Sequence, residues 1–238
     1  AYQHWLKSTE EVKQKDPQAS WKEIHKICGE CPWPQPVGWQ SPFRPNGLHE
    51  TMIRRIAPYS LRGFLYYQGE EDVQRYADYS DMMLMLVKQW RMDWNDWNLP
   101  FLFVQLPMYL ADGEKDDSYW ALQREQQYIA SMMIQNAGMI SLADCGEYDN
   151  IHPLDKKTPG ERLFQLAKNL VYDKQGTITA TAAQLFSDDG KLYVTFDHLH
   201  EKLVMQTVNG CPFEISGEDN LFYPAKADVI HGNMLCIS

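Results

Sequence analysis

The chain has 238 residues, of which 44% are hydrophobic and 23% charged, a composition that is ordinary for a packed globular protein. Its formal net charge of -10 argues against nucleic acid as a partner, because nucleic-acid binding needs a basic patch, and against an anionic membrane surface. No apolar stretch reaches the roughly 18–20 residues of a membrane-spanning helix, and the first residues show neither the basic start nor the apolar core of a signal peptide.

Residues 1–45 are predicted to form an irregular, partly helical insertion. Helices are expected over Trp5–Lys15 and Ser20–Ile27, and a proline-rich stretch after them interrupts regular structure. Cys28 and Cys31 form a Cys-x-x-Cys pair, but a zinc site normally shows a second pair of ligands, and none lies nearby. A local disulfide or two ordinary thiols is therefore favoured, and no metal is predicted.

Residues 46–173 alternate between strand-like and helix-like segments. The apolar runs of strand length are Leu61–Tyr67, Phe101–Leu106 and Met139–Ala143, and apolar residues three or four apart mark helices over Asp72–Trp90, Ser118–Asn136 and Thr158–Val171. A short helix is also expected between residues 46 and 58. Strands and helices in this order are typical of a parallel sheet with helices on both faces, so the sequence predicts an α/β fold of three layers, α/β/α.

Residues 177–238 change to short β-like runs separated by glycines. The runs are Thr177–Thr181, Leu192–Phe196, Leu203–Val208, Phe213–Ile215 and Met234–Ile237. This pattern predicts a small β-sandwich region. Because the sequence stops on a strand-like run, we expect this region to be truncated.

Two short motifs follow predicted strands, where ligands bind in a parallel α/β sheet. The first is Gln68-Gly69-Glu70, and the second is the Asp-x-x-His pair of Asp149 and His152. Acyl transfer through a serine needs an imidazole that takes the hydroxyl proton and a carboxylate that holds the imidazole in the right tautomer. His152 and Asp149 have the residue types and the spacing for these roles. The alternative is an aspartate that caps a helix beside a surface histidine.

The first motif has the groups that an oxyanion needs. The side-chain NH2 of Gln68 and a backbone N–H at Gly69 are candidate donors, and Glu70 is grouped with them as a candidate oxyanion or substrate-binding residue. The alternative is an ordinary turn after a strand, with glycine needed for its dihedral angles and Glu70 placed favourably at a helix start.

Both motifs, taken with their neighbours, resemble the sialate O-acetylesterase family of the SGNH or GDSL hydrolases. The resembling segments are residues 63–70, residues 100–106 and residues 149–163, the last of which ends in Gly160-Glu161-Arg162-Leu163. The resemblance covers roughly residues 41–173, and the tail from 177 looks like part of the family's β-sandwich region. It implies an SGNH-hydrolase-like α/β/α enzyme that removes O-acetyl groups from carbohydrates by a Ser-His-Asp mechanism without a cofactor. It also implies a secreted or periplasmic setting.

The resemblance implies a role for each motif residue. His152 is expected to be the general base, Asp149 its orienting partner, and Gln68 with Gly69 beside it the binder of the oxyanion. Acetylated sialic acid is the leading substrate, and acetylated xylan or other plant glycans follow closely. No residue in the sequence separates these substrates.

The nucleophile is not identified in the sequence. In the family it lies in an early Gly-Gln-Ser-Asn-like segment after the first strand, and none of the eleven serines has this context; Ser41 is the nearest, but it follows no predicted strand and precedes a proline. We therefore expect a sheet that is incomplete on its N-terminal side, with the nucleophile supplied by an N-terminal segment or subunit. The alternative is a non-catalytic carbohydrate-binding or interaction module on the same scaffold.

Overall fold

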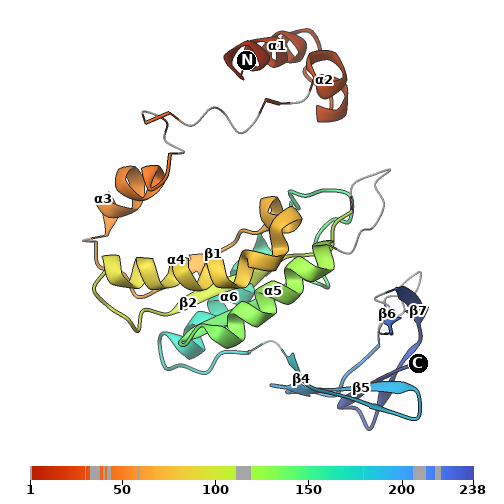
Figure 1. The fold of residues 1–238 in the computed structure, drawn as a ribbon. Helices are drawn as coiled ribbons and strands as arrows, with labels where there is room; N and C mark the ends of the chain where they lie inside the picture. Colours follow the sequence, from red (N-terminus) through yellow and green to blue (C-terminus); the bar gives the residue numbers. More distant parts are fainter. Residues whose placement is uncertain are drawn as a thin grey trace. The chain divides into compact units, whose positions relative to one another are not determined.

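The computed structural model describes most of the chain. The described residues are 2–29, 31–32, 38–39, 41, 44–57, 59–110, 119–178, 180–205, 213–217 and 221–238. The chain divides into two compact units, Ala1–Ser60 and Leu61–Ser238, and both candidate motifs lie in the second unit (Figure 1).

The first unit is helical. It contains α1 (Tyr2–Lys15), α2 (Trp21–Cys28), the π-helix η1 (His49–Ile53) and α3 (Arg54–Ile56). Helix α2 starts with a capping box, in which the Ser20 hydroxyl accepts from the backbone N–H of Glu23 and the Glu23 carboxylate accepts from the backbone N–H of Ser20 at 2.8 Å. The helices predicted between residues 5 and 27 are thus confirmed. Cys28 and Cys31 are free thiols.

The second unit begins with a three-stranded parallel sheet. Its strands are β1 (Phe64–Tyr66), β2 (Phe101–Gln105) and β3 (Ala137–Ser141), in the order β1-β2-β3. The central strand β2 is apolar almost throughout because both of its edges are paired and both of its faces are covered. The outer edge of β1 pairs with no strand in the described part of the chain, and Leu65 on this strand is 65% exposed.

Helices cover the two faces of the sheet. Phe101 and Phe103 of β2 pack against α4 (Tyr79–Asp93) and α5 (Tyr119–Met133), whereas the alternate residues Leu102 and Val104 pack against α6 (Lys157–Leu170). Figure 1 shows α4 and α5 side by side on one face and α6 on the other. The predicted three-layer α/β/α architecture is therefore confirmed.

Some predicted boundaries shift for local reasons. The helix expected over Asp72–Trp90 is two elements, the 3-10 helix η2 (Glu70–Asp78) and then α4, and Arg75 departs from helical dihedral angles within η2. Strand β3 starts two residues before the predicted Met139, so Gly138 lies inside the strand. A Cβ at Gly138 would lie 2.6 Å from the side chain of Leu170, so this glycine allows α6 to pack closely on the sheet.

A set of antiparallel strands follows. Strands β4 (Thr181–Asp188), β5 (Lys191–Asp197), β9 (Met234–Ile237) and β8 (Ala227–Ile230) form one sheet in that order, and β6 (Phe213–Ser216) pairs with β7 (Phe222–Ala225). Residues of both sheets share one apolar core, built around Val194, Ala225 and Leu235. Two sheets on one core agree with the predicted small sandwich.

The β-region was predicted less accurately than the parallel sheet. Residues 203–205 are not in a strand, and the rest of the run predicted over Leu203–Val208 lies outside the described residues. Strand β4 begins where the predicted run Thr177–Thr181 ends, and β7 and β8 were not predicted. Pro224 lies within β7, and a proline argues against a strand when only the sequence is considered, although it is tolerated on an edge strand.

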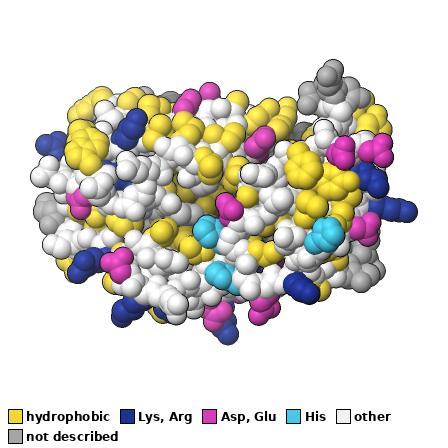
Figure 2. Space-filling model, turned by 90° about the horizontal axis from the view of Figure 1, so that it is seen from below, with side chains coloured by type: hydrophobic (Ala, Val, Ile, Leu, Met, Phe, Trp, Pro, Cys, Tyr) yellow, Lys and Arg dark blue, Asp and Glu magenta, His cyan; other side chains and the backbone are white. Residues whose placement is uncertain are grey.

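The surface of the described residues shows no strong separation of charge in the view of Figure 2. On this face acidic and basic side chains are scattered among apolar ones. No helix in the described ranges is long and apolar enough to cross a bilayer.

Candidate active site

The first motif lies at the carboxyl end of β1, where the chain turns into η2. Gly69 is buried at this turn and has a φ of 144°, which side chains rarely adopt. A Cβ at this position would lie 2.9 Å from Nε2 of Gln127 and 3.0 Å from Nε2 of Gln123. Both the dihedral angle and the lack of space therefore require glycine here.

The side chain of Gln68 is held at both ends of its amide. Its Oε1 accepts a hydrogen bond from the Tyr66 hydroxyl at 3.1 Å, and its Nε2 donates to Oδ2 of Asp72 at 2.6 Å. Asp72 in turn accepts from the guanidinium of Arg75 at 3.3 Å. An amide NH2 carries two N–H donors, and Asp72 takes one of them.

The backbone carbonyl of Gln68 is also held, from the helix side. It accepts from the hydroxyl of Tyr79 at 3.1 Å and from Nε2 of Gln127 at 3.2 Å. Burial raises the pKa of Tyr66 to about 12, and burial also raises the pKa of Tyr79. Both phenols therefore keep their protons and donate throughout the neutral range.

A cavity of about 450 Å³ adjoins the first motif. Its lining comes from β1, η2 and α4, with Tyr66, Gln68, Asp72, Arg75 and Asp78 as polar groups and three apolar side chains, Met82, Met83 and Leu86, beside Tyr79. This volume is in the range of small-molecule sites. Asp149 and His152 are not among the lining residues.

The second motif lies on the loop between β3 and α6. Glu147 holds this loop closed, because one carboxylate oxygen accepts from the backbone N–H of Leu154 at 2.6 Å and the other accepts from Nδ2 of Asn150 at 2.7 Å. Oδ1 of Asn150 accepts from the backbone N–H of His152 at 3.0 Å. The backbone hydrogen bond from Leu154 and the bond from Asn150 hold the pKa of Glu147 below its usual value.

Asp149 and His152 are both exposed on this loop. Across the described ranges no hydrogen bond joins their side chains, so the structure brings the two residues onto one short turn without pairing them. Glu147 and Asn150, rather than Asp149, fix the backbone around His152. The catalytic roles of Asp149 and His152 stay predictions.

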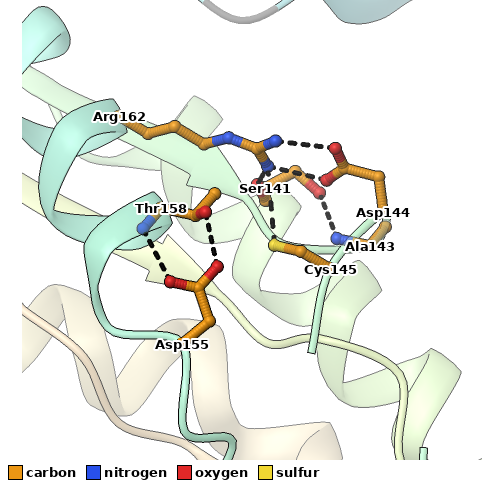
Figure 3. Close-up of polar contacts among 7 residues, drawn as sticks. All are labelled: Ser141, Ala143, Asp144, Cys145, Asp155, Thr158 and Arg162. Carbon is orange, nitrogen blue, oxygen red and sulfur yellow. Dashed lines mark hydrogen bonds and ion pairs between the residues drawn. The ribbon is translucent and has the colours of Figure 1, made fainter. Parts of the chain in front are cut away.

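Arg162 on α6 fixes the start of the same loop. Its guanidinium donates to the backbone carbonyl of Ser141 and to both carboxylate oxygens of Asp144, each at 2.6 Å (Figure 3). The Arg162 hydrogen bonds hold the pKa of Asp144 below its usual value, whereas burial raises the pKa of the neighbouring Cys145 thiol. Cys145 therefore stays protonated at neutral pH and is a poor nucleophile.

The end of the loop is fixed as well. Oδ1 of Asp155 accepts from the backbone N–H of Thr158, and Oδ2 accepts from the Thr158 hydroxyl (Figure 3). Oδ1 also accepts from the backbone N–H of Lys157, so Asp155 caps the first turn of α6. The adjacent Lys156 places its Nζ 5.1 Å from the ring centre of Tyr67, directly before Gln68. Both motif loops therefore lie at the same edge of the sheet, as their positions after β1 and β3 predict.

The family model for carbohydrate esterases described as sialic acid-specific acetylesterases matches residues 36–169, more than half of the chain. The chain belongs to this family. The matched range contains the parallel sheet and both motifs, so the predicted family membership is confirmed.

Individual relatives agree with the family model. The chain is 27% identical to the sialate O-acetylesterase of Mus musculus over 196 residues, which is 74% of this chain and 36% of the relative. It is 25% identical to the sialate O-acetylesterase of Homo sapiens over 208 residues, 79% of this chain and 39% of the relative. The chain thus spans well under half of the length of these curated relatives.

A solved structure supports the fold. The crystal structure of a carbohydrate acetylesterase from Xanthomonas citri matches with a TM-score of 0.72 and 31% identity, covering 82% of this chain and 46% of that one. The acetylesterase-family chain therefore has the SGNH-hydrolase-like α/β/α fold that its sequence predicts.

Sequence reasoning found only some of the residues that hold the motifs. The run of carboxylates Glu70, Glu71 and Asp72 suggests that one of them braces the Gln68 loop, and the structure shows that Asp72 makes this contact. Gln127 and Glu147 were missed. The available signal for Gln127 was a glutamine among the inward-facing residues of an amphipathic helix, since a buried amide needs partners.

Proposed function

We propose that this chain contributes the oxyanion-binding and His–Asp parts of a carbohydrate O-acetylesterase active site. The observation that carries the proposal is the Gln68–Gly69 turn, whose amide and carbonyl are held by partly buried hydrogen bonds at the carboxyl end of the parallel sheet. The loop of His152 ends at the same edge, where Lys156 contacts Tyr67. Membership of the acetylesterase family supports hydrolysis of acetyl esters as the reaction for this site.

In the proposed mechanism, His152 takes the proton of a serine hydroxyl as the serine attacks the acetyl carbonyl. Asp149 turns toward the ring to hold its tautomer, and the NH2 of Gln68 and the N–H of Gly69 bind the oxyanion. The intermediate then expels the sugar oxygen, which receives the proton from His152. Water next attacks the acetyl-serine with His152 again as base. The bond between the acetyl carbon and the serine oxygen then breaks, the serine oxygen takes the proton from His152, and acetate leaves.

We propose that the serine comes from an N-terminal segment or subunit outside these residues. No serine in the described ranges has a hydrogen bond to His152. The limited coverage of the relatives and the unpaired outer edge of β1 among the described strands support the same proposal. Acetylated sialic acid is the leading substrate, before acetylated xylan and other plant glycans. A secreted or periplasmic location stays a prediction.

A non-catalytic carbohydrate-binding or interaction module is the second candidate. One observation favours it: in the described structure no hydrogen bond joins the side chains of Asp149 and His152. A module that binds carbohydrate without hydrolysing the ester has no need of this pair.

Acetate release separates the two candidates. The natural full-length polypeptide that carries these residues is assayed with 4-nitrophenyl acetate, O-acetylated sialic acid and acetylated xylan. We expect hydrolysis by the wild type and a loss of at least about 100-fold in kcat for His152→Ala, since a general base contributes roughly 10²–10⁴-fold. The control is His200→Ala, an exposed histidine of the β-region, which should change kcat by less than about twofold. A wild type that releases no acetate from any substrate overturns the esterase proposal in favour of the binding module.

A further inference from the structure

Helix α5 carries two buried glutamines one turn apart on the face toward the first motif. Gln123 and Gln127 both have 0% of their surface exposed. Both also approach Gly69, because each Nε2 lies within 3.0 Å of the place where a Cβ of this residue would stand. The two side chains thus share type, helix, burial and neighbour.

Their hydrogen bonding is opposite. Gln127 donates from Nε2 to the carbonyl of Gln68 at 3.2 Å and to the carbonyl of Val104 at 3.3 Å, and its Oε1 accepts from the backbone N–H of Leu106 at 2.9 Å. Neither amide atom of Gln123 has a hydrogen-bond partner among the described residues. Gln127 is therefore tied to the backbone by three bonds, whereas Gln123 has no such bond among the described residues.

The three bonds of Gln127 come where the pairing of β1 with β2 stops. The last pair in register is Tyr66 with Phe103, so a continued ladder would set Gln68 opposite Gln105. Instead, the side-chain amide of Gln127 lies between strand β2 and the segment that follows β1, and it donates hydrogen bonds to a backbone carbonyl of each. It replaces the missing ladder bonds and leaves the chain free to turn at Gly69.

The hydrogen bond from Gln127 also affects the orientation of the peptide group between Gln68 and Gly69. In a planar trans peptide the carbonyl of one residue and the N–H of the next point in opposite directions. The Gln68 carbonyl points to Gln127 and Tyr79. The N–H of Gly69 must therefore point away from them, and its direction is set by the partners of that carbonyl.

We propose that Gln127 is a positioning residue that aims the Gly69 N–H at the oxyanion, and that Gln123 has no part in this positioning. The inference rests on the proposed function for its catalytic consequence. The orientation of the peptide itself follows from the hydrogen bonds alone.

The test compares Gln127→Met with Gln123→Met in the natural full-length polypeptide, with 4-nitrophenyl acetate as substrate. Methionine keeps the length of either side chain and removes the amide. We expect Gln127→Met to lower kcat by about 100-fold with KM nearly unchanged, because misaligning an oxyanion donor affects the transition state and leaves ground-state binding intact. Gln123→Met should keep kcat within about threefold, since replacing an unpaired buried amide by an apolar group is nearly neutral.

Equal losses in both variants, or a normal kcat in Gln127→Met, would overturn the proposal. If Gln127→Met does not fold, Tyr79→Phe serves as the second variant, because it removes the other hydrogen bond to the Gln68 carbonyl and keeps the ring. A loss of kcat at unchanged KM in Tyr79→Phe supports the proposal, and a normal kcat contradicts it.

Amide hydrogen exchange at Gly69 and Leu106 gives a readout that needs no catalysis. We expect faster exchange at both amides in Gln127→Met and unchanged exchange in Gln123→Met. If the wild type shows no esterase activity, the proposed function fails, and the exchange rates alone support or overturn the positioning of the peptide.

Discussion

The two motif loops are held by different physical means. The Gln68–Gly69 turn is held mainly by neutral groups, the phenols of Tyr66 and Tyr79 and the buried amide of Gln127, with the Asp72 carboxylate as its ionised contact. The loop of His152 is held by ionised groups near the surface, Glu147, Asp155 and the Arg162–Asp144 pair. The comparison indicates a fixed Gln68–Gly69 turn and a His152 loop whose position depends on charge, because exposed ionic contacts are weak and sensitive to pH and salt.

The largest effect is expected from adding a side chain at the fixed turn. Gly69→Ala places a Cβ about 3 Å from two glutamine amides in a conformation that alanine rarely adopts. We expect the free energy of unfolding to fall by about 2–3 kcal/mol, measured by urea denaturation.

Gly160→Ala is the matched control for that substitution. Gly160 lies in α6, and no atom stands within 4 Å of its added Cβ. Alanine should raise stability there by about 0.5–1 kcal/mol through its helix propensity. Equal changes in the free energy of unfolding of the two variants would show that the close neighbours of Gly69 do not disfavour a side chain there.

A smaller loss is expected from releasing the start of the histidine loop. Arg162→Met removes the bonds to Ser141 and Asp144 but keeps the apolar stem of the side chain. We expect a loss of about 1 kcal/mol, since Asp144 is 67% exposed and solvent screens the pair. Arg162→Lys should recover part of this loss, because it keeps the charge without the two-pronged contact. An unfolding energy equal to that of the wild type in Arg162→Met would contradict the anchoring role.

The smallest effect is the response of the two loops to acid. The pKa of Glu147 is lowered in the folded chain, so its contribution to loop closure is complete above its unfolded pKa, about 4.3, and is lost as the pH falls through the lower folded value. We expect the backbone amide of Leu154 to lose its protection from hydrogen exchange as the pH falls below about 4. The amide of Leu106, held by the neutral Gln127, should keep its protection over the same range.

Glu147→Gln tests the source of that response. The amide keeps one oxygen acceptor but does not titrate in this range. The pH dependence of exchange at Leu154, corrected for intrinsic rates, should therefore disappear in the variant. A response that persists in Glu147→Gln would assign the titration to another group of the loop.

The parts of the fold that the sequence predicts well are those in which one strong pattern decides the structure. Strand β2 was predicted because five consecutive residues of a strand buried on both faces must be largely apolar. Helix α6 was predicted from its periodicity and from Pro159 in its first turn. Strand β7 was missed because Pro224 argues against a strand in the sequence, and its acceptance depends on the position of β7 at the edge of a two-stranded sheet.

The candidate site likewise contains residues that the sequence indicates and residues that only the folded structure brings together. Its motif residues were singled out by their types and spacing, and their roles stay predictions. The contact from Gln127 was not predicted, because Gln127 is 59 residues from Gln68 in the sequence and becomes its neighbour only when α5 packs on the sheet. The kink at Arg75 within η2 was also missed, because the apolar spacing of this segment predicts a single helix.

The outer edge of β1 bears on how the chain behaves in concentrated solution. No strand of the described part pairs with this edge, and Leu65 stands exposed beside it. Such an edge is a template to which an extended segment of another molecule can add, the first step of aggregation. The strand is only three residues long, which limits the length of ladder that a second molecule can form. Covering this edge would therefore remove a site at which copies of the chain can associate.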